Sequence, residues 1–184
     1  MDGPIYKSHR ARLIEVATGH FLRSGMIMTK MDDISQEAGV SKKTLYKEFH
    51  SKERLVNCCL ELILKQLFKD LCIVLNTLDS AEDSWQYSLM LISRRASEAS
   101  PMFHRDLLSK KEHLDFFHKQ WDLLTNKLLQ RFELTNIGKL KIVLDAFQNM
   151  LIHVLAHNVR GVNPEQLSNI LLPIYASNNV FRVE

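Results

Sequence analysis

The sequence predicts an all-α protein with about nine helices. Apolar residues recur at the i, i+3/i+4 spacing of amphipathic helices, and no segment has the two-residue alternation of a strand. The 184 residues include only six Gly and four Pro, too few for the frequent tight turns of a sandwich or a barrel. With 46% apolar and 24% charged residues, the chain has a globular composition, which excludes a fibrous or disordered protein.

Helix-ending and helix-capping residues separate the expected helices. Gly25 ends the first helix, and Thr29 with Asp32 predicts a capping box at the start of the second. Gly39 supplies the left-handed backbone of a sharp turn, and Ser41 caps the third helix. The nine helices are expected at about 10–24, 30–38, 42–49, 52–78, 80–99, a short one from 101, 112–132, 139–158 and 164–180.

The net charge of +3 lies entirely in the first third of the chain. Residues 1–55 hold ten Lys/Arg against seven Asp/Glu, whereas residues 56–184 hold fourteen of each. Such a small excess most simply indicates a solvated surface, and an acidic partner such as nucleic acid is the less favoured interpretation. Local motifs therefore have to decide between these two interpretations.

Residues 34–49 have the pattern of a helix-turn-helix. This motif needs a small residue where two helices touch, a turn glycine, and a second helix with one apolar side and one side that offers donors to a DNA groove. Ala38 and Gly39 meet the first two needs, and Leu45 and Phe49 form the apolar side. The expected DNA-binding side chains are Lys43 and Thr44 for base edges, Tyr46 and Lys47 for phosphates, and Lys42 beside them.

A specific set of residues extends beyond this motif, from about Leu13 to Leu55. The set consists of Phe21 and Gly25, Thr29, Asp33-Ile34, Ala38-Gly39-Val40-Ser41, Leu45-Tyr46, Phe49, Ser51-Lys52-Glu53 and Leu55. Together these residues resemble the tetracycline-repressor (TetR) family of bacterial transcription regulators. Gly19 inside the first helix departs from the family pattern, as does Glu48, which we expect to face solvent.

The resemblance implies a dimeric transcription repressor that a small, mainly apolar effector releases from a double-stranded DNA operator. The expected domains are a helix-turn-helix DNA-binding domain over 1–54 and a helical effector-binding and dimerisation domain over 55–184. Lys52, at the start of the long helix, is expected to contact backbone phosphate. Large apolar side chains of the C-terminal part suit either a core or a ligand cavity. Those expected to line the cavity are Trp85, Phe117, Trp121 and Phe147.

The last two expected helices, 139–158 and 164–180, carry apolar residues on more than one face. One face serves the helix's own core, and the other requires a partner. The pattern therefore predicts a two-fold homodimer built from a four-helix bundle.

Other residue patterns indicate no catalytic site and no cofactor. Cys58, Cys59 and Cys72 lack metal-ligand spacing and are interpreted as buried thiols in a reducing compartment. Neither a secretion signal nor an apolar run long enough for a membrane span is present, so a cytoplasmic location is expected. The basic pairs are interpreted as solvated charges, with an inward-turned arginine that binds an anionic ligand as the alternative. These pairs are Arg94-Arg95 and Lys110-Lys111.

Two other functions stay open at this point. His153 and His157 lie one helical turn apart, so an all-helical enzyme or metal-binding protein is one alternative, although the pair lacks the glutamate of the zincin pattern and a structural role is favoured. A constitutive DNA-binding dimer without an effector is the other. The metal content and the salt dependence of DNA binding distinguish the first alternative from a regulator.

Overall fold

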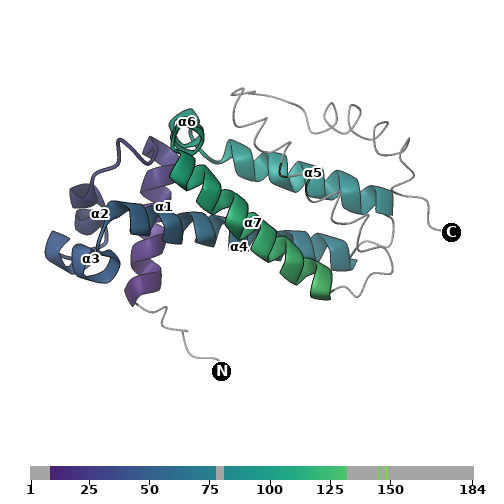
Figure 1. The fold of residues 1–184 in the computed structure, drawn as a ribbon, viewed down its shortest axis with the longest axis horizontal. Helices are drawn as coiled ribbons and strands as arrows, with labels where there is room; N and C mark the ends of the chain where they lie inside the picture. Colours follow the sequence, from purple (N-terminus) through teal and green to yellow (C-terminus); the bar gives the residue numbers. More distant parts are fainter. Residues whose placement is uncertain (1–8, 78–80, 132–144, 146–147, 149–184) are drawn as a thin grey trace. The chain divides into compact units, whose positions relative to one another are not determined.

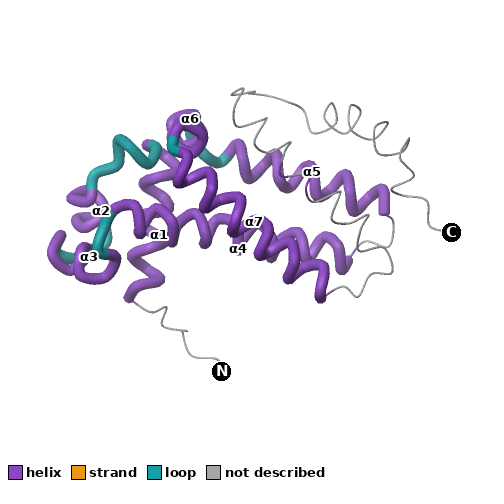
Figure 2. The backbone as a smooth tube through the Cα atoms, viewed as in Figure 1, coloured by secondary structure: helices purple, strands orange, loops and turns teal. Residues whose placement is uncertain are grey.

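The computed structural model describes residues 9–77, 81–131, 145 and 148. Seven helices account for most of these residues, and no strand occurs among them (Figures 1 and 2). The all-α prediction is therefore confirmed. The expected helices over 139–158 and 164–180 lie outside the described residues. The described helices are α1 (His9–Ser24), α2 (Met31–Glu37), α3 (Lys42–Phe49), α4 (Lys52–Thr77), α5 (Ala81–Ser97), α6 (Pro101–Ser109) and α7 (Lys111–Arg131).

The described residues divide into two compact units. The first contains the residues up to Ile63 together with Ala99–Phe117, and the second contains Leu64–Glu98 and the described residues from His118 onward. None of the helices in the described part of the chain is apolar enough over a sufficient length to cross a membrane.

The first unit has a core built from one face of each of its helices. Helix α2 packs against both α1 and α3, and α6 packs against α1. The apolar stripe of α1 meets those of its neighbours because residues three and four apart share one side of a helix. The most completely buried side chains of this core include Leu13, Phe21, Met26, Ile34, Leu45, Phe49, Leu55 and Leu60.

Gly25 ends α1 for two reasons. Its φ of +78° lies in the left-handed region that favours glycine. A Cβ at this position would also lie 2.6 Å from Oδ2 of Asp106 and 3.0 Å from Cβ of Met102, both in α6. Glycine therefore allows the chain to turn and lets α6 approach the end of α1. The Ser100 amide, which donates to the Leu22 carbonyl at 2.7 Å, holds the start of α6 there.

The capping box expected at Thr29 is wrong. Its hydroxyl is buried and donates to the Gly25 carbonyl at 2.6 Å, so it stabilises the turn after α1 instead of the start of α2. Lys30 is the N-cap of α2 and makes no side-chain capping bond. Thr29 correctly indicates that a helix begins nearby, but its hydroxyl bonds to the turn before that helix.

The turn of the helix-turn-helix agrees with the prediction. Gly39 has a φ of +67°, and nothing lies within 4 Å of the place where a Cβ would stand. Glycine is therefore required by the backbone conformation alone. Ser41 caps α3 as expected, because its Oγ accepts from the Thr44 amide at 3.0 Å.

A strained turn joins α3 to α4. His50 has a φ of +65° and a ψ of −38°, and the Ser51 amide donates to the Phe49 carbonyl across it at 2.7 Å. This is the geometry of a classic γ-turn, which is rare for a residue with a side chain. Ser51 then caps α4, since its Oγ accepts from the Arg54 amide at 3.1 Å.

The second unit buries apolar residues of α4, α5 and α7. The rings of Phe68 and Trp121 meet edge to face with centroids 4.9 Å apart, an arrangement that aromatic quadrupoles favour. Arg95 of α5 pairs with Asp70 of α4 and with Glu98. Arg95 is therefore occupied by carboxylates of the protein, which is evidence against its binding an anionic ligand.

The cysteines are free thiols, but only one of them is buried. Cys59 lies in the core of the first unit, and burial raises the pKa of its thiol to about 12. Cys58 and Cys72 are half-exposed, so the expectation of three buried thiols is wrong for these two. Both lie on flanks of the long helix α4 that its apolar stripe does not cover.

Candidate nucleic-acid interface

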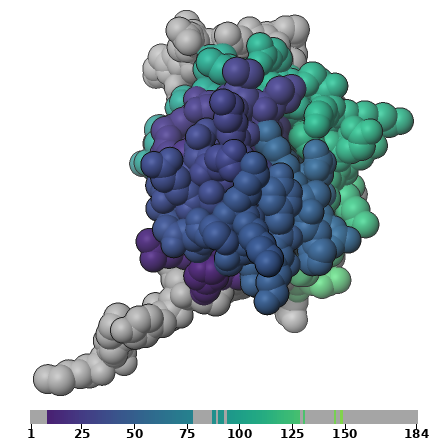
Figure 3. All heavy atoms as spheres, turned by 90° about the vertical axis from the view of Figure 1, so that its left-hand side faces the viewer, coloured from purple at the N-terminus to yellow at the C-terminus, as the bar shows by residue number. Residues whose placement is uncertain are grey.

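Helix α3 presents a line of polar side chains opposite its buried face. Leu45 and Phe49 are at most 1% exposed, which fixes the rotation of the helix about its axis. The exposed side chains that result are Lys42, Lys43, Tyr46 and Lys47. Figure 3 shows the surface formed by the N-terminal helices, drawn in purple and blue. An exposed helix face with several donors of this kind is the side that a helix-turn-helix offers to the major groove.

Lys42 is engaged by a carboxylate of α2. Its Nζ lies 2.9 Å from Oδ1 and 3.0 Å from Oδ2 of Asp32. The hydrogen bond and charge of Asp32 raise the pKa of this lysine. Both side chains are about half exposed, so water weakens the pair. Lys42 is thus available to DNA only in competition with Asp32.

Thr44 is partly buried at the start of α3. Its Oγ1 lies 2.8 Å from Oγ of Ser41, within the N-terminal cap. To contact a base edge, this hydroxyl must either bind the base in addition to Ser41 or give up its hydrogen bond with Ser41. Thr44 is therefore a less accessible donor than Lys43 or Tyr46, both of which are exposed.

Lys52 is turned toward the loop between α1 and α2. Its Nζ donates to the Ile27 carbonyl at 2.9 Å, and the side chain is half-buried. Burial lowers the pKa of Lys52, and the nearby charge of Lys110 acts in the same direction. The ammonium has two further N–H donors, which suit a phosphate at the start of α4.

Two other residues of this region are Glu48 and Arg10. Glu48 is partly buried and keeps part of its surface exposed, so its expected solvent-facing position stays a prediction. Arg10 belongs to no motif of the sequence. Its guanidinium lies 4.8 Å from the centre of the Phe49 ring and donates to Sγ of Cys58 at 3.4 Å. Arg10 thereby brings a positive charge from the start of α1 to the end of α3, a contact that no local sequence pattern signals.

A link between α1 and α2 includes His20. Its Nε2 lies 2.8 Å from Oε2 of Glu37, which Arg23 also approaches at 3.5 Å. At Gly19, the other unusual residue of this helix, the three heavy atoms nearest to a Cβ built on it all belong to the Arg23 side chain. The glycine therefore does not reflect close packing between helices.

The N-terminal segment matches a known family of sequences. Residues 13–59 match the model of the bacterial regulatory proteins of the tetR family. This segment is similar to the N-terminal domain of that family. The match runs from within α1 through the helix-turn-helix to the first turns of α4, the segment on which the sequence resemblance depends. The N-terminal part of the chain is thus similar to TetR-family regulators over the helix-turn-helix and the helices beside it.

Solved structures share this fold over nearly the whole chain. A Rhodococcus sp. protein assigned to the TetR family has a TM-score of 0.65 and 14% identity, over 95% of this chain and 98% of that chain. A transcriptional regulator from Aquifex aeolicus VF5 has a TM-score of 0.58 and 20% identity, over 91% and 99%. The fatty acid degradation regulator FadR from Bacillus halodurans has a TM-score of 0.61 and 13% identity, over 98% and 96%. At these identities the likeness shows a shared fold.

The residues expected to line an effector cavity are only partly described. Trp121 is completely buried and Phe117 almost so. The side chain of Trp85 and the whole of Phe147 lie outside the described residues, as do His153 and His157. Among the described residues, no three His, Cys, Asp or Glu side chains gather in an arrangement that suits a metal ion.

Proposed function

We propose that this chain is a TetR-type regulator, a homodimeric repressor that binds a double-stranded DNA operator through α3 and is released by a small, mainly apolar effector. The observation that carries the DNA-binding part is the rotation of α3, with Leu45 and Phe49 buried and Lys43, Tyr46 and Lys47 exposed. DNA binding is assigned to residues 1–54, and effector binding and dimerisation to residues 55–184.

The exposed donors divide into two roles in this proposal. Lys43 and Thr44, near the start of α3, reach base edges, and Tyr46 and Lys47, one turn later, reach phosphate oxygens. Lys42 joins them when Asp32 releases it. Lys52 contacts phosphate from the start of α4, where the first backbone amides of the helix add to its charge.

The experiment that tests this surface compares two double variants. Lys43→Ala with Lys47→Ala removes two exposed lysines of α3, and Lys65→Ala with Lys69→Ala removes two exposed lysines of α4 as a control of equal charge. Binding to labelled random duplex DNA is measured by fluorescence anisotropy between about 50 and 200 mM salt. The α3 variant should bind more weakly, with a salt slope smaller by about 0.9 for each phosphate that a lysine no longer neutralises.

Equal losses of affinity in the two double variants would show that only net charge matters and would contradict the assignment to α3. A Lys52→Met variant adds a further check, because a phosphate contact should weaken all DNA sequences alike when it is removed. Circular dichroism of each variant verifies that the helices are intact.

Release by an effector requires the ligand to bind two arrangements of the protein with different affinity. Helix α4 contains both Lys52 and Phe68, and the ring of Phe68 packs on Trp121. A ligand that moves this ring pair would therefore also move the helix that carries the proposed phosphate contact. A coupling of ~1–3 kcal/mol is enough to change DNA occupancy 5–150-fold. The proposed cavity residues remain Trp85, Phe117, Trp121 and Phe147.

A thermal-shift screen tests the effector. Aromatic metabolites and long-chain fatty acids are the first probes, the latter because the similar Bacillus halodurans protein is a fatty acid degradation regulator. Ligands that raise the melting temperature are then tested for release of DNA, in the wild type and in Trp121→Phe. Stabilising ligands that leave DNA affinity unchanged would instead support the constitutive DNA-binding dimer.

The dimer has a separate test. Sedimentation velocity at micromolar concentration should give the mass of two chains, twice the 21.4 kDa of one. A monomer would contradict the proposal. That the chain is not an enzyme and binds no cofactor also stays a prediction.

A further inference from the structure

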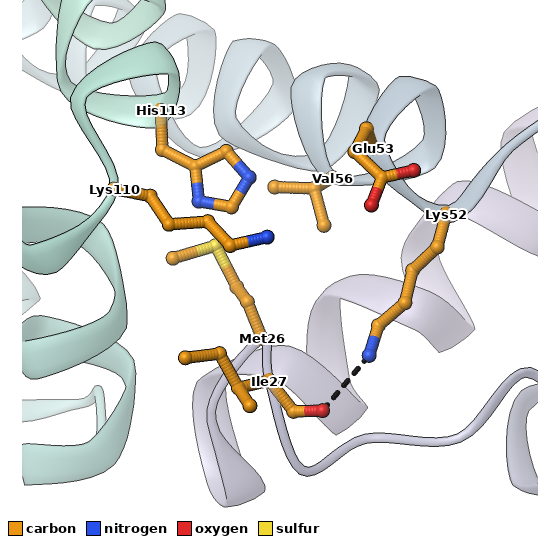
Figure 4. Close-up of a pocket in the computed structure, with 7 residues that line it drawn as sticks. All are labelled: Met26, Ile27, Lys52, Glu53, Val56, Lys110 and His113. Carbon is orange, nitrogen blue, oxygen red and sulfur yellow. Dashed lines mark hydrogen bonds between the residues drawn. The ribbon is translucent and has the colours of Figure 1, made fainter.

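A pocket of about 210 Å³ opens in the first unit (Figure 4). The loop after α1, the start of α4 and the start of α7 each contribute to its wall. It is lined by Met26, Ile27, Lys52, Glu53, Val56, Lys110 and His113. No sequence pattern predicts it, because these residues come from three separate segments and Lys110 has the pattern of a solvated charge.

Two ammonium groups face this pocket from different elements. Figure 4 shows the Lys110 side chain extending between His113 and Met26, with Lys52 on the opposite side. Nζ of Lys52 donates to the Ile27 carbonyl at 2.9 Å. Burial is the main cause of the lowered pKa of Lys52, and the positive charge of Lys110 lowers this pKa further. Like charges brought together in this way favour an anion between them.

The carboxylate of Glu53 also lines the pocket. Its own backbone amide lowers its pKa, and a hydrogen bond from Ser51 and the charges of Lys110 and Lys52 do the same. Glu53 is therefore ionised at neutral pH. Two ammoniums and one carboxylate leave the lining with a single positive charge, which suits a monoanion better than a dianion such as phosphate.

His113 supplies a buried ring nitrogen to the pocket. The residue is 4% exposed, and its Nδ1 has no hydrogen-bond partner in the described part of the chain. Burial and the charge of Lys110 lower the pKa of His113, against smaller opposing effects of the Asp106 backbone, Glu112 and Glu53. The ring is thus neutral at pH 7. A buried nitrogen of this kind is stabilised when a ligand bonds to it.

The remaining walls are apolar. Met26 and Val56 are nearly completely buried and present carbon and sulfur atoms to the pocket (Figure 4). A ligand that satisfies the whole lining has a charged oxygen-bearing end and a short hydrocarbon tail. A cation is excluded by the two lysines, and a large metabolite by the volume.

We propose that this pocket binds a small aliphatic monocarboxylate. The carboxylate lies between Lys52 and Lys110. Its negative charge favours protonation of His113, and Nδ1–H of the resulting imidazolium donates to the carboxylate while the ring keeps its hydrogen bond to the Asp106 backbone. The hydrocarbon tail packs on Met26 and Val56. This site lies in the first unit, and none of its lining residues is among those proposed for the effector cavity.

A carboxylate bound in this pocket should weaken DNA binding. This expectation rests on the proposed phosphate contact of Lys52. A bound carboxylate attracts the ammonium of Lys52 into the pocket, where the Ile27 carbonyl already holds it. The lysine is then withdrawn from a DNA phosphate. The ligand and the DNA compete for one side chain, so each should weaken the binding of the other.

The test uses the full chain with sodium butyrate, and butyramide as an uncharged probe of the same shape, at constant ionic strength. Calorimetry measures binding, and ¹⁵N-histidine NMR follows the Nδ1 resonance of His113. Lys110→Met removes one ammonium and keeps the length of the side chain, and Lys111→Met is the matched control on an exposed neighbour. Butyrate should bind and shift the His113 resonance, and butyramide should not.

Lys110→Met should weaken butyrate binding about tenfold, since it removes one charge-assisted contact, while Lys111→Met should leave it unchanged. Equal binding of butyrate and butyramide, or equal losses of affinity in the two lysine variants, would overturn the site. These measurements contain no DNA, so they stand whether or not the proposed function is correct. Butyrate that binds but leaves DNA affinity unchanged would overturn only the competition for Lys52.

Discussion

The carboxylate of Asp106 accepts a hydrogen bond from the backbone amide of Ile27, with Oδ2 and N 2.7 Å apart. Asp106 lies in α6 and is completely buried, whereas Ile27 lies in the loop that leads into the helix-turn-helix. The same oxygen lies close to Gly25, where no other residue would leave room for it. One side chain from the middle of the chain thus holds the loop before α2.

We expect Asp106→Ala to destabilise the protein by about 1–3 kcal/mol, because it leaves the partly buried Ile27 amide without its acceptor. Urea unfolding followed by circular dichroism measures the free energy of unfolding. Arg105→Ala is the control, since that side chain is exposed and its contact with Asp106 is long at 3.4 Å. A loss of stability no larger than that of the control would mean that the Ile27 amide finds another acceptor.

Gly19→Ala should raise the free energy of unfolding by up to about 1 kcal/mol, because alanine favours a helix interior. The added Cβ would meet Nη1 of Arg23 at 3.2 Å, and this exposed side chain is able to move away. Gly39→Ala should act in the opposite direction and cost ~1–2 kcal/mol, because φ is +67° there. The two variants are compared by thermal unfolding. Destabilisation by Gly19→Ala would show that Arg23 cannot move.

Asp32→Asn should strengthen binding to random duplex DNA several-fold, because it removes the carboxylate that engages Lys42. Fluorescence anisotropy at low salt measures the change. Asp33→Asn is the matched control, since it removes the same charge from the next exposed residue of α2. Similar gains in both variants would point to general charge repulsion, with no specific release of Lys42.

Iodoacetamide at pH 8 should modify Cys58 and Cys72 of the folded protein before Cys59, as measured by mass spectrometry. Burial raises the pKa of Cys59 from 9.0 to about 12, so its thiol stays protonated while the unfolded thiol ionises. This contribution to stability is complete below about pH 9 and is lost as pH rises toward 12. Unfolded protein should show all of Cys58, Cys59 and Cys72 modified. Early modification of Cys59 would contradict its burial.

Features that depend on residues close together in the chain were predictable from the amino-acid sequence alone. Apolar spacing predicted the described helices to within a few residues, and Ser41 and Gly39 predicted the cap and the turn before α3. These features succeed because helix faces, caps and positive φ angles involve residues within about four positions of one another. The helix-turn-helix was recognisable for the same reason.

Contacts between side chains far apart in the sequence depend on how the helices pack. The hydroxyl of Thr29 could bond either to the start of α2 or to the turn after α1. In the packed structure it donates to the Gly25 carbonyl in that turn. Lys42 and Lys52 both matched a DNA-binding pattern, yet their ammonium groups are held by Asp32 and by the Ile27 carbonyl. Long flexible side chains reach several partners, so their positions follow from the packing around them.

Lys52, Lys110 and His113 line one pocket although they lie far apart in the sequence. Each residue alone has the pattern of a solvated charge or an ordinary histidine, and nothing in the local sequence relates them. Their convergence depends on α6 docking against the end of α1, which Gly25 allows and Asp106 holds. Periodicity determines which face of a helix is buried, but only the docking of helices determines which distant residues share a cavity.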